Sequence, residues 1–177
     1  QVDLASEFRY SDPLVDEKSL VIVISQSGET LDTMAAMREA KRRGARTLAV
    51  VNVVGSSIAR EADDVLYTWA GPEIAVATTK AYSTQLVLMD LIGLYLADLL
   101  GTVEQSEYDA IIKEIQLLPE KLQGWLADVH NVQYFASRYF NHNSIFFIGR
   151  NLDYAMGLEG SLKLKEISYI HSEAYAS

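Results

Sequence analysis

A short polar segment carries the residue types best suited to bind an anion. Residues 25–30 read Ser-Gln-Ser-Gly-Glu-Thr and directly follow residues 20–24, a β-branched run with the pattern of a buried strand. In open α/β sheets, ligands bind beyond the carboxyl ends of strands, where the next helix presents unpaired N–H groups and the positive end of its dipole. An uncharged donor cluster in that position can hold a phosphate monoester. Its donors are the hydroxyls of Ser25, Ser27 and Thr30 and the amide of Gln26, and Gly28 allows close backbone approach.

A plainer interpretation of the same segment is a polar turn in which Ser27 or Thr30 only caps the following helix. Two nucleotide-binding alternatives are excluded, because the chain contains neither G-x-x-x-x-G-K-[ST] nor G-x-G-x-x-G. A mononucleotide or a sugar phosphate remains as the ligand class.

A second group of chemically capable residues lies near the end of the chain. Glu159, Lys163 and Glu166 are spaced four and then three residues apart, so a helix would place them on one face. By spacing alone, an ordinary ladder of surface ion pairs is the favoured interpretation. The alternative is acid–base chemistry, because a carboxylate that moves a proton between adjacent carbons needs a nearby cation to stabilise the charge that develops.

The elements around these residues follow an α/β pattern. The predicted strand at 20–24 is followed by a predicted helix at 31–43 that ends at Gly44, and by a second strand at 47–51. This β-α-β unit implies a parallel sheet with helices on its faces and hence a doubly wound α/β fold. A short helix and a third strand continue the pattern at residues 56–62 and 65–69.

Helices dominate the second half of the predicted fold. We expect a helix from about Thr78 to Leu100, whose apolar stretch from residue 86 carries two aspartates, is too short for a membrane span and should be buried. Further helices are expected at 106–125, broken or kinked by Pro119, and at 131–140. A strand at 144–150 and a helix at 155–170 then restart the α/β pattern. We therefore expect a first domain at residues 1–128 and a truncated second domain at 129–177.

Composition narrows the function classes. The 177 residues include 15 basic and 24 acidic side chains, for a net charge of −9, and nucleic acid is therefore an unfavourable partner. The chain has no cysteine, which rules out disulfides and thiolate metal sites and fits a reducing cytoplasm. Its first residues do not resemble a signal peptide, and the lack of an initiator Met suggests an excised piece.

Three motifs in order along the chain resemble the isomerase region of the glutamine-fructose-6-phosphate aminotransferase family, which is built from SIS (sugar isomerase) domains. The motifs are residues 25–30, the segment Val-Ala-Thr-Thr-Lys-Ala at 76–81, and the segment from Leu158 to Tyr175. The first is shared by many SIS domains, whereas the third is closer to this family than to other sugar isomerases. The resemblance implies a flavodoxin-like SIS fold, followed by the start of a second SIS domain.

The resemblance also implies roles for individual residues. Ser25, Gln26, Ser27 and Thr30 would hold the phosphate of fructose 6-phosphate. Val76, Ala77 and Thr78 would line the sugar, with Thr78 standing where the family often has serine. Glu166 would be the proton-transfer base and Lys163 its electrostatic partner, whereas Lys165 and Glu173 would be solvated or structural. His171 is expected to be a packed, hydrogen-bonded residue at a helix end and not a catalyst.

The parent reaction implied by the resemblance converts fructose 6-phosphate and ammonia from a glutaminase domain into glucosamine 6-phosphate, in a cytoplasmic homodimer to which residues 86–100 contribute. No cofactor or metal is expected. The resemblance also implies parts of the enzyme that this chain lacks. These are the strand and serine loop before residue 1, a downstream histidine, a C-terminal lysine that forms the Schiff base, and the glutaminase domain. We therefore expect this chain to bind a sugar phosphate weakly and not to complete the reaction. Two alternatives stay open, a non-catalytic SIS module that senses a sugar phosphate and an ammonia-independent phosphosugar isomerase.

Overall fold

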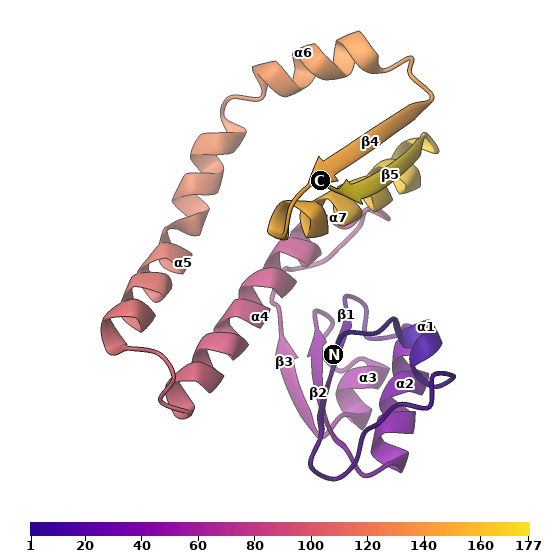
Figure 1. The fold of residues 1–177 in the computed structure, drawn as a ribbon, viewed down its shortest axis with the longest axis vertical. Coiled ribbons are helices and arrows are strands. Elements are labelled where there is room, and N and C mark those ends of the chain that lie inside the picture. The colour runs from indigo at the N-terminus through magenta and orange to yellow at the C-terminus, as the bar shows by residue number, and fades with distance from the viewer. The chain divides into compact units, whose positions relative to one another are not determined.

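The computed structural model describes all residues from 1 to 177, and these form two compact units. One unit comprises residues 1–74 and 78–99, and the other comprises residues 75–77 and 100–177. Each unit has its own parallel sheet (Figure 1). The predicted domain boundary between residues 128 and 129 stays a prediction.

The first unit is built around a three-stranded parallel sheet in the order β1-β2-β3. β1 (Leu20–Ser25), β2 (Arg46–Val51) and β3 (Asp64–Tyr67) pair in register, with Leu20 opposite Arg46 and Leu48 opposite Asp64. The short α1 (Ala5–Phe8) precedes β1, and α2 (Leu31–Arg42) and α3 (Ser57–Glu61) connect the strands. The predicted third strand ends at Tyr67, two residues early, because Trp69 adopts a positive φ of 53°.

One hydrophobic cluster joins the strands to α2 and α3, which lie against the sheet in Figure 1. Successive side chains of a strand point to opposite faces, so every second residue of β1 and β2, including Val23, Ala49 and Val51, faces the helices. The buried members of the cluster are Val23, Met34, Met37, Ala49, Val51 and Ile58. Gly44, at a φ of 92°, lies just after the end of α2 and stops the helix as predicted. Packing of α2 on the sheet therefore fixes both elements that the loop between β1 and α2 connects.

The long helix α4 (Lys80–Leu99) corrects one prediction. Only Ala81 and Leu94 are buried in it, whereas large apolar side chains such as Tyr95 and Leu99 are exposed. The expectation of a buried helix at residues 86–100 is therefore wrong for this chain. An apolar run indicates that a helix favours a covered environment, but it does not specify which element provides the cover. No helix of the chain combines the length and apolar character that a membrane span requires.

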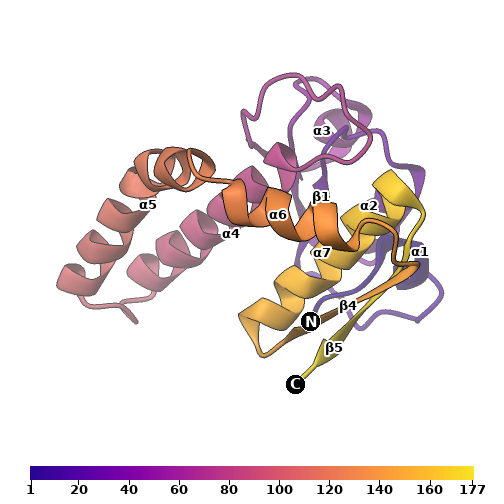
Figure 2. The ribbon, with the colours of Figure 1, turned by 90° about the horizontal axis from the view of Figure 1, so that it is seen from above.

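The second unit contains a two-stranded parallel sheet of β4 (Ser144–Gly149) and β5 (His171–Ala176), covered by α7 (Leu152–Ser168). Gly160 of α7 packs against Phe147, since a Cβ at this glycine would lie 3.1 Å from the ring. α5 (Gln105–Leu126) and α6 (His130–Tyr139) have no buried residue, and α5 lies away from this sheet in both ribbon views (Figure 2).

Two predictions in the second unit need comment. Of the break or kink predicted at Pro119, the break does not occur, because α5 continues through this residue, and the kink stays a prediction. α7 ends at Ser168, where Tyr169 takes the left-handed conformation and turns the chain into β5. His171 therefore begins a strand and does not end a helix, and its exposed ring is hydrogen-bonded to Ser144 Oγ through Nδ1. The strand was missed because its sequence, His-Ser-Glu-Ala-Tyr-Ala, lacks the apolar run by which the other strands were predicted.

Candidate sugar-phosphate site

The predicted phosphate loop, residues 25–30, connects the carboxyl end of β1 to the first turn of α2. Ser25 is buried, and its Oγ lies 2.9 Å from Thr30 Oγ1 and accepts a hydrogen bond of 3.1 Å from the N–H of Gly28. Ser27 Oγ accepts from the N–H of Glu29 at 3.1 Å. The loop is therefore shaped by its own hydroxyls, which hold three consecutive peptide units in a tight curve.

Gly28 makes this curve possible. Its φ is 66°, which side-chain-bearing residues rarely adopt, and a Cβ at this position would lie 2.0 Å from Ser56 Oγ and 2.5 Å from Ser56 Cβ. Ser56 is buried and its hydroxyl has no hydrogen-bond partner. Only glycine fits between the loop and the start of α3.

The structure also decides against the capping interpretation of this segment. Thr30 occupies the N-cap position of α2 but makes no side-chain cap hydrogen bond, because its hydroxyl is paired with Ser25. Ser27 bonds within the loop and does not reach a first-turn N–H. Helices leave their first N–H groups without intrahelical acceptors, and a twelve-residue helix carries a positive partial charge at that end. The first turn of α2 is thus left able to receive an acceptor from outside the chain.

A cavity of about 530 Å³ lies at the same edge of the sheet and is lined by residues of the loops that follow β1, β2 and β3. Its lining residues are Gln26, Ser27, Asn52, Val53, Gly71, Pro72 and Glu73. A larger hollow of about 720 Å³ runs along β1, and none of the predicted site residues lines it. The smaller cavity therefore coincides with the predicted ligand edge.

Asn52 joins the three loops around that cavity. Its Oδ1 accepts hydrogen bonds from Thr68 Oγ1 at 3.1 Å and from the N–H of Ala70 at 2.8 Å, and its Nδ2 donates to the carbonyl of Gly71 at 2.8 Å. Its backbone N–H donates to the carbonyl of Gln26 at 3.1 Å. Sequence reasoning missed this residue, although its position directly after the strand at 47–51 matches the position of Ser25 after the first strand.

The predicted sugar-contacting residues lie between β3 and α4. Thr78 Oγ1 donates to Glu73 Oε2 at 2.7 Å, so Glu73, which also lines the cavity, orients the hydroxyl that was predicted to face the sugar. Val76 is exposed and Ala77 is partly buried. Both belong to the second unit, and their sugar-contacting role stays a prediction.

α7 brings Glu159, Lys163 and Glu166 together on one face, as their spacing predicts, and their acid–base role stays a prediction. Lys163 Nζ lies 2.6 Å from Glu166 Oε2 and 3.5 Å from Glu159 Oε1. The hydrogen bond to Glu166 raises the pKa of Lys163, against the opposing effect of partial burial. The three side chains are only 18–32% exposed, which distinguishes them from a fully solvated ladder of ion pairs. Nearby, Lys165 and Glu173 form a more exposed pair at 3.2 Å, in line with a structural role.

These features define a class of protein: a parallel α/β unit whose first strand is followed by an open loop rich in hydroxyl and amide groups. A family model described as the SIS domain matches residues 1–95, and this chain belongs to that family. The predicted SIS-type α/β fold is confirmed by a solved C-terminal domain of glucosamine-fructose-6-phosphate aminotransferase from Francisella tularensis. That structure matches with a TM-score of 0.95 and 38% identity, over 99% of this chain and 50% of that one.

Curated relatives carry the family name that the motifs indicated. The chain is 61% identical over 175 residues to a glutamine-fructose-6-phosphate aminotransferase [isomerizing] of Caldanaerobacter subterraneus, and 59% identical over 177 residues to one of Clostridium tetani. These matches cover 99% and 100% of the chain, but only 29% of each relative. The chain thus spans less than a third of the length of these relatives.

Proposed function

We propose that this chain is the fructose 6-phosphate-binding isomerase part of a glutamine-fructose-6-phosphate aminotransferase. The observation that carries the proposal is the loop of neutral donors at the carboxyl end of β1, which leaves the first turn of α2 uncapped beside a cavity of about 530 Å³. In the proposed binding mode, the phosphate accepts hydrogen bonds from the loop and from the first-turn N–H groups. The donors are Ser25, Gln26, Ser27 and Thr30.

Neutral donors suit a sugar phosphate that must be exchanged in each turnover. The phosphate dianion gains several short hydrogen bonds without a fixed ion pair. Val76, Ala77 and Thr78 would contact the sugar, and Glu73 would keep the Thr78 hydroxyl oriented.

The proposed chemistry moves one proton between adjacent carbons. Once ammonia and a proton taken from water have replaced the C2 carbonyl oxygen of the ketose to give a protonated imine and water, Glu166 removes a proton from C1 and a neutral enolamine forms. The same carboxyl group returns the proton to C2, the C1 hydroxyl proton is lost to water, and the C1 carbonyl of glucosamine 6-phosphate results. The Lys163 ammonium, 2.6 Å from Glu166, stabilises the charge that develops during the transfer.

The rest of the proposed enzyme lies in the longer polypeptide. A glutaminase domain of the same polypeptide would supply the ammonia, and two copies would form a cytoplasmic homodimer. The exposed apolar residues of α4 would contribute to that dimer. Within the chain, residues 1–128 would correspond to the first SIS domain and residues 129–177 to the start of the second.

The test is isotope exchange at C1 and C2 of the sugar phosphate in the full-length enzyme. Glu166→Gln is expected to slow exchange by about 10²–10⁴-fold, the usual contribution of a positioned general base. Glu173→Gln, which removes the carboxylate paired with Lys165, is the matched control and should leave exchange within about twofold. Undiminished exchange in Glu166→Gln would remove the assigned base. A sugar-phosphate sensor without chemistry would show no exchange in either form.

A further inference from the structure

Glu29 is the only acidic residue of the phosphate loop. A carboxylate repels a phosphate dianion bound beside it, so Glu29 would weaken phosphate binding unless it has another role in the loop. In the structure, Glu29 Oε1 accepts a hydrogen bond of 2.7 Å from the backbone N–H of Ser57, the first residue of α3. Hydrogen bonding to Ser57, first through its side chain and then through its N–H, holds the pKa of Glu29 below its ordinary value.

The contact belongs to a seam between the phosphate loop and residues 52–58. The carbonyl of Gly28 accepts from the N–H of Ile58 at 3.0 Å, and the carbonyl of Gln26 accepts from the N–H of Asn52 at 3.1 Å. Glu29 differs from these two contacts, because it joins the seam through its side chain, which bonds to Ser57. It is therefore the contact that substitution can remove without altering the backbone.

Glu29 also links the seam to a proposed phosphate ligand. Its own N–H donates to Ser27 Oγ at 3.1 Å, while its carboxylate reaches Ser57. The residue thus connects the Ser27 hydroxyl on one side with the start of α3 on the other. If the Glu29 carboxylate no longer bonds to Ser57, the Ser27 hydroxyl and the backbone at Gly28 are held less firmly in their present conformation.

We propose that Glu29 is a positioning residue of the sugar-phosphate site, which holds the loop in its anion-binding shape by anchoring it to the N–H of Ser57. The inference rests on the proposed function of the loop as the phosphate site. Anchoring also directs the carboxylate toward a backbone donor, where its charge is partly compensated. A neutral side chain with the same acceptor oxygen, glutamine, preserves the anchor.

The proposal and simple electrostatics predict opposite results. If Glu29 only repelled the phosphate, both Glu29→Ala and Glu29→Gln would tighten phosphate binding. If Glu29 positions the loop, Glu29→Ala weakens binding although it removes a negative charge, and Glu29→Gln restores it. Glu17→Ala is the matched control, because Glu17 is an exposed carboxylate in the turn before β1 and lies outside the phosphate loop, the first turn of α2 and residues 52–58.

The experiment measures KM for fructose 6-phosphate, kcat, and the inhibition constant of inorganic phosphate in the full-length enzyme. Glu29→Ala should raise KM and the phosphate inhibition constant by about five- to tenfold, as expected for one lost charge-assisted hydrogen bond, with kcat within about twofold. Glu29→Gln and Glu17→Ala should stay within about twofold of wild type. Thermal melts should show that all variants remain folded.

Two results would overturn the proposal. One is a KM for Glu29→Ala that equals or falls below that of wild type, and the other is an equal rise in both Glu29 variants. A wild-type enzyme that does not act on fructose 6-phosphate would instead contradict the proposed function. Calorimetric titration of the same variants with inorganic phosphate then decides the role of Glu29 independently, and absence of phosphate binding in wild type would overturn both.

Discussion

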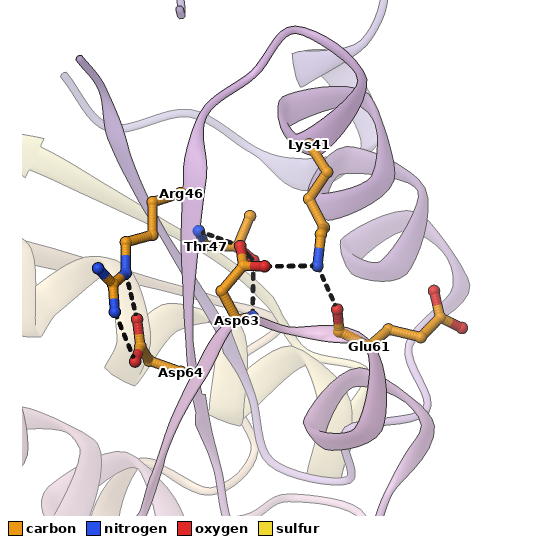
Figure 3. A network of polar contacts seen from close by, with 6 residues as sticks. All are labelled: Lys41, Arg46, Thr47, Glu61, Asp63 and Asp64. Atoms are coloured by element: carbon orange, nitrogen blue, oxygen red, sulfur yellow. Dashed lines mark hydrogen bonds and ion pairs between the residues drawn. The ribbon is translucent and has the colours of Figure 1, made fainter. Parts of the chain in front are cut away.

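The two ends of the sheet β1-β2-β3 are stabilised by different chemistry. At the amino end, Asp63 Oδ1 pairs with Lys41 Nζ at 2.8 Å, and Asp63 Oδ2 accepts from the N–H and hydroxyl of Thr47 (Figure 3). Arg46 and Asp64 form a bidentate ion pair beside them. At the carboxyl end, the loops are joined mainly by hydroxyl, amide and backbone groups around Ser25 and Asn52.

This difference indicates that the two ends of the sheet have different roles, one in stability and the other in ligand binding. Charges at the amino end are paired, because Lys41 has carboxylate and carbonyl partners and Arg46 has a carboxylate partner. The carboxyl end keeps an uncapped helix turn and a cavity. We therefore expect changes at the amino end to alter stability, and changes at the carboxyl end to alter ligand binding.

The largest effect is expected for Gly28→Ala at the carboxyl end. The new Cβ meets the buried Ser56 side chain and must adopt a φ of 66°, which together should lower the free energy of unfolding by roughly 2–4 kcal/mol and abolish phosphate binding. Gly55→Ala is the matched control, because Gly55 has a φ of 73° but open space around its Cβ position, and should cost only about 1–2 kcal/mol.

Chemical denaturation gives both free energies, and titration with fructose 6-phosphate gives the binding. Equal losses in the two variants would show that backbone conformation alone is responsible and that close packing against Ser56 contributes nothing.

The position of this loop was predictable from sequence, whereas its supports were not. The run at residues 20–24, the helix ending at Gly44 and the strand at 47–51 are local patterns, and they suffice to place Ser25–Thr30 at the ligand edge. Asn52 and the bond from Ser57 to Glu29 depend on contacts between segments 16 to 28 residues apart. Periodicity carries no information about such contacts. The same limit explains the missed strand β5, whose pairing partner β4 lies 27 residues earlier.

A smaller effect, on stability alone, is expected for Asp63→Asn at the amino end. Hydrogen bonds from Lys41 and Thr47 hold the pKa of Asp63 well below its ordinary value. A carboxylate with a lowered folded-state pKa stabilises the fold above its unfolded-state pKa of about 3.9, and this contribution is lost as the pH falls toward the folded-state value. Asp63→Asn should therefore lower Tm at neutral pH, and the difference from wild type should shrink below about pH 4.

Melting curves followed by circular dichroism from neutral to acid pH test this dependence. Asp98→Asn, an exposed carboxylate substitution on α4, should show no comparable dependence. If the Tm difference for Asp63→Asn stays constant into acid, its origin is geometry and not charge. Titration with fructose 6-phosphate at neutral pH should give wild-type affinity for the folded Asp63→Asn variant, which separates the two ends of the sheet.

The smallest effect on stability is expected for Arg46→Ala, at the residue of β2 directly before Thr47. Arg46 pairs with Asp64 at 2.7 Å, but the two side chains are 69% and 43% exposed. Water screens such a pair, and ordering two long side chains offsets most of its attraction. The Tm of Arg46→Ala should therefore be hard to distinguish from that of wild type, and added salt should not separate the two. A fall in Tm as large as that of Asp63→Asn would contradict this expectation. It would show that the Arg46–Asp64 pair supports the contacts of Asp63 with Thr47 and Lys41, so that the amino end acts as one coupled network.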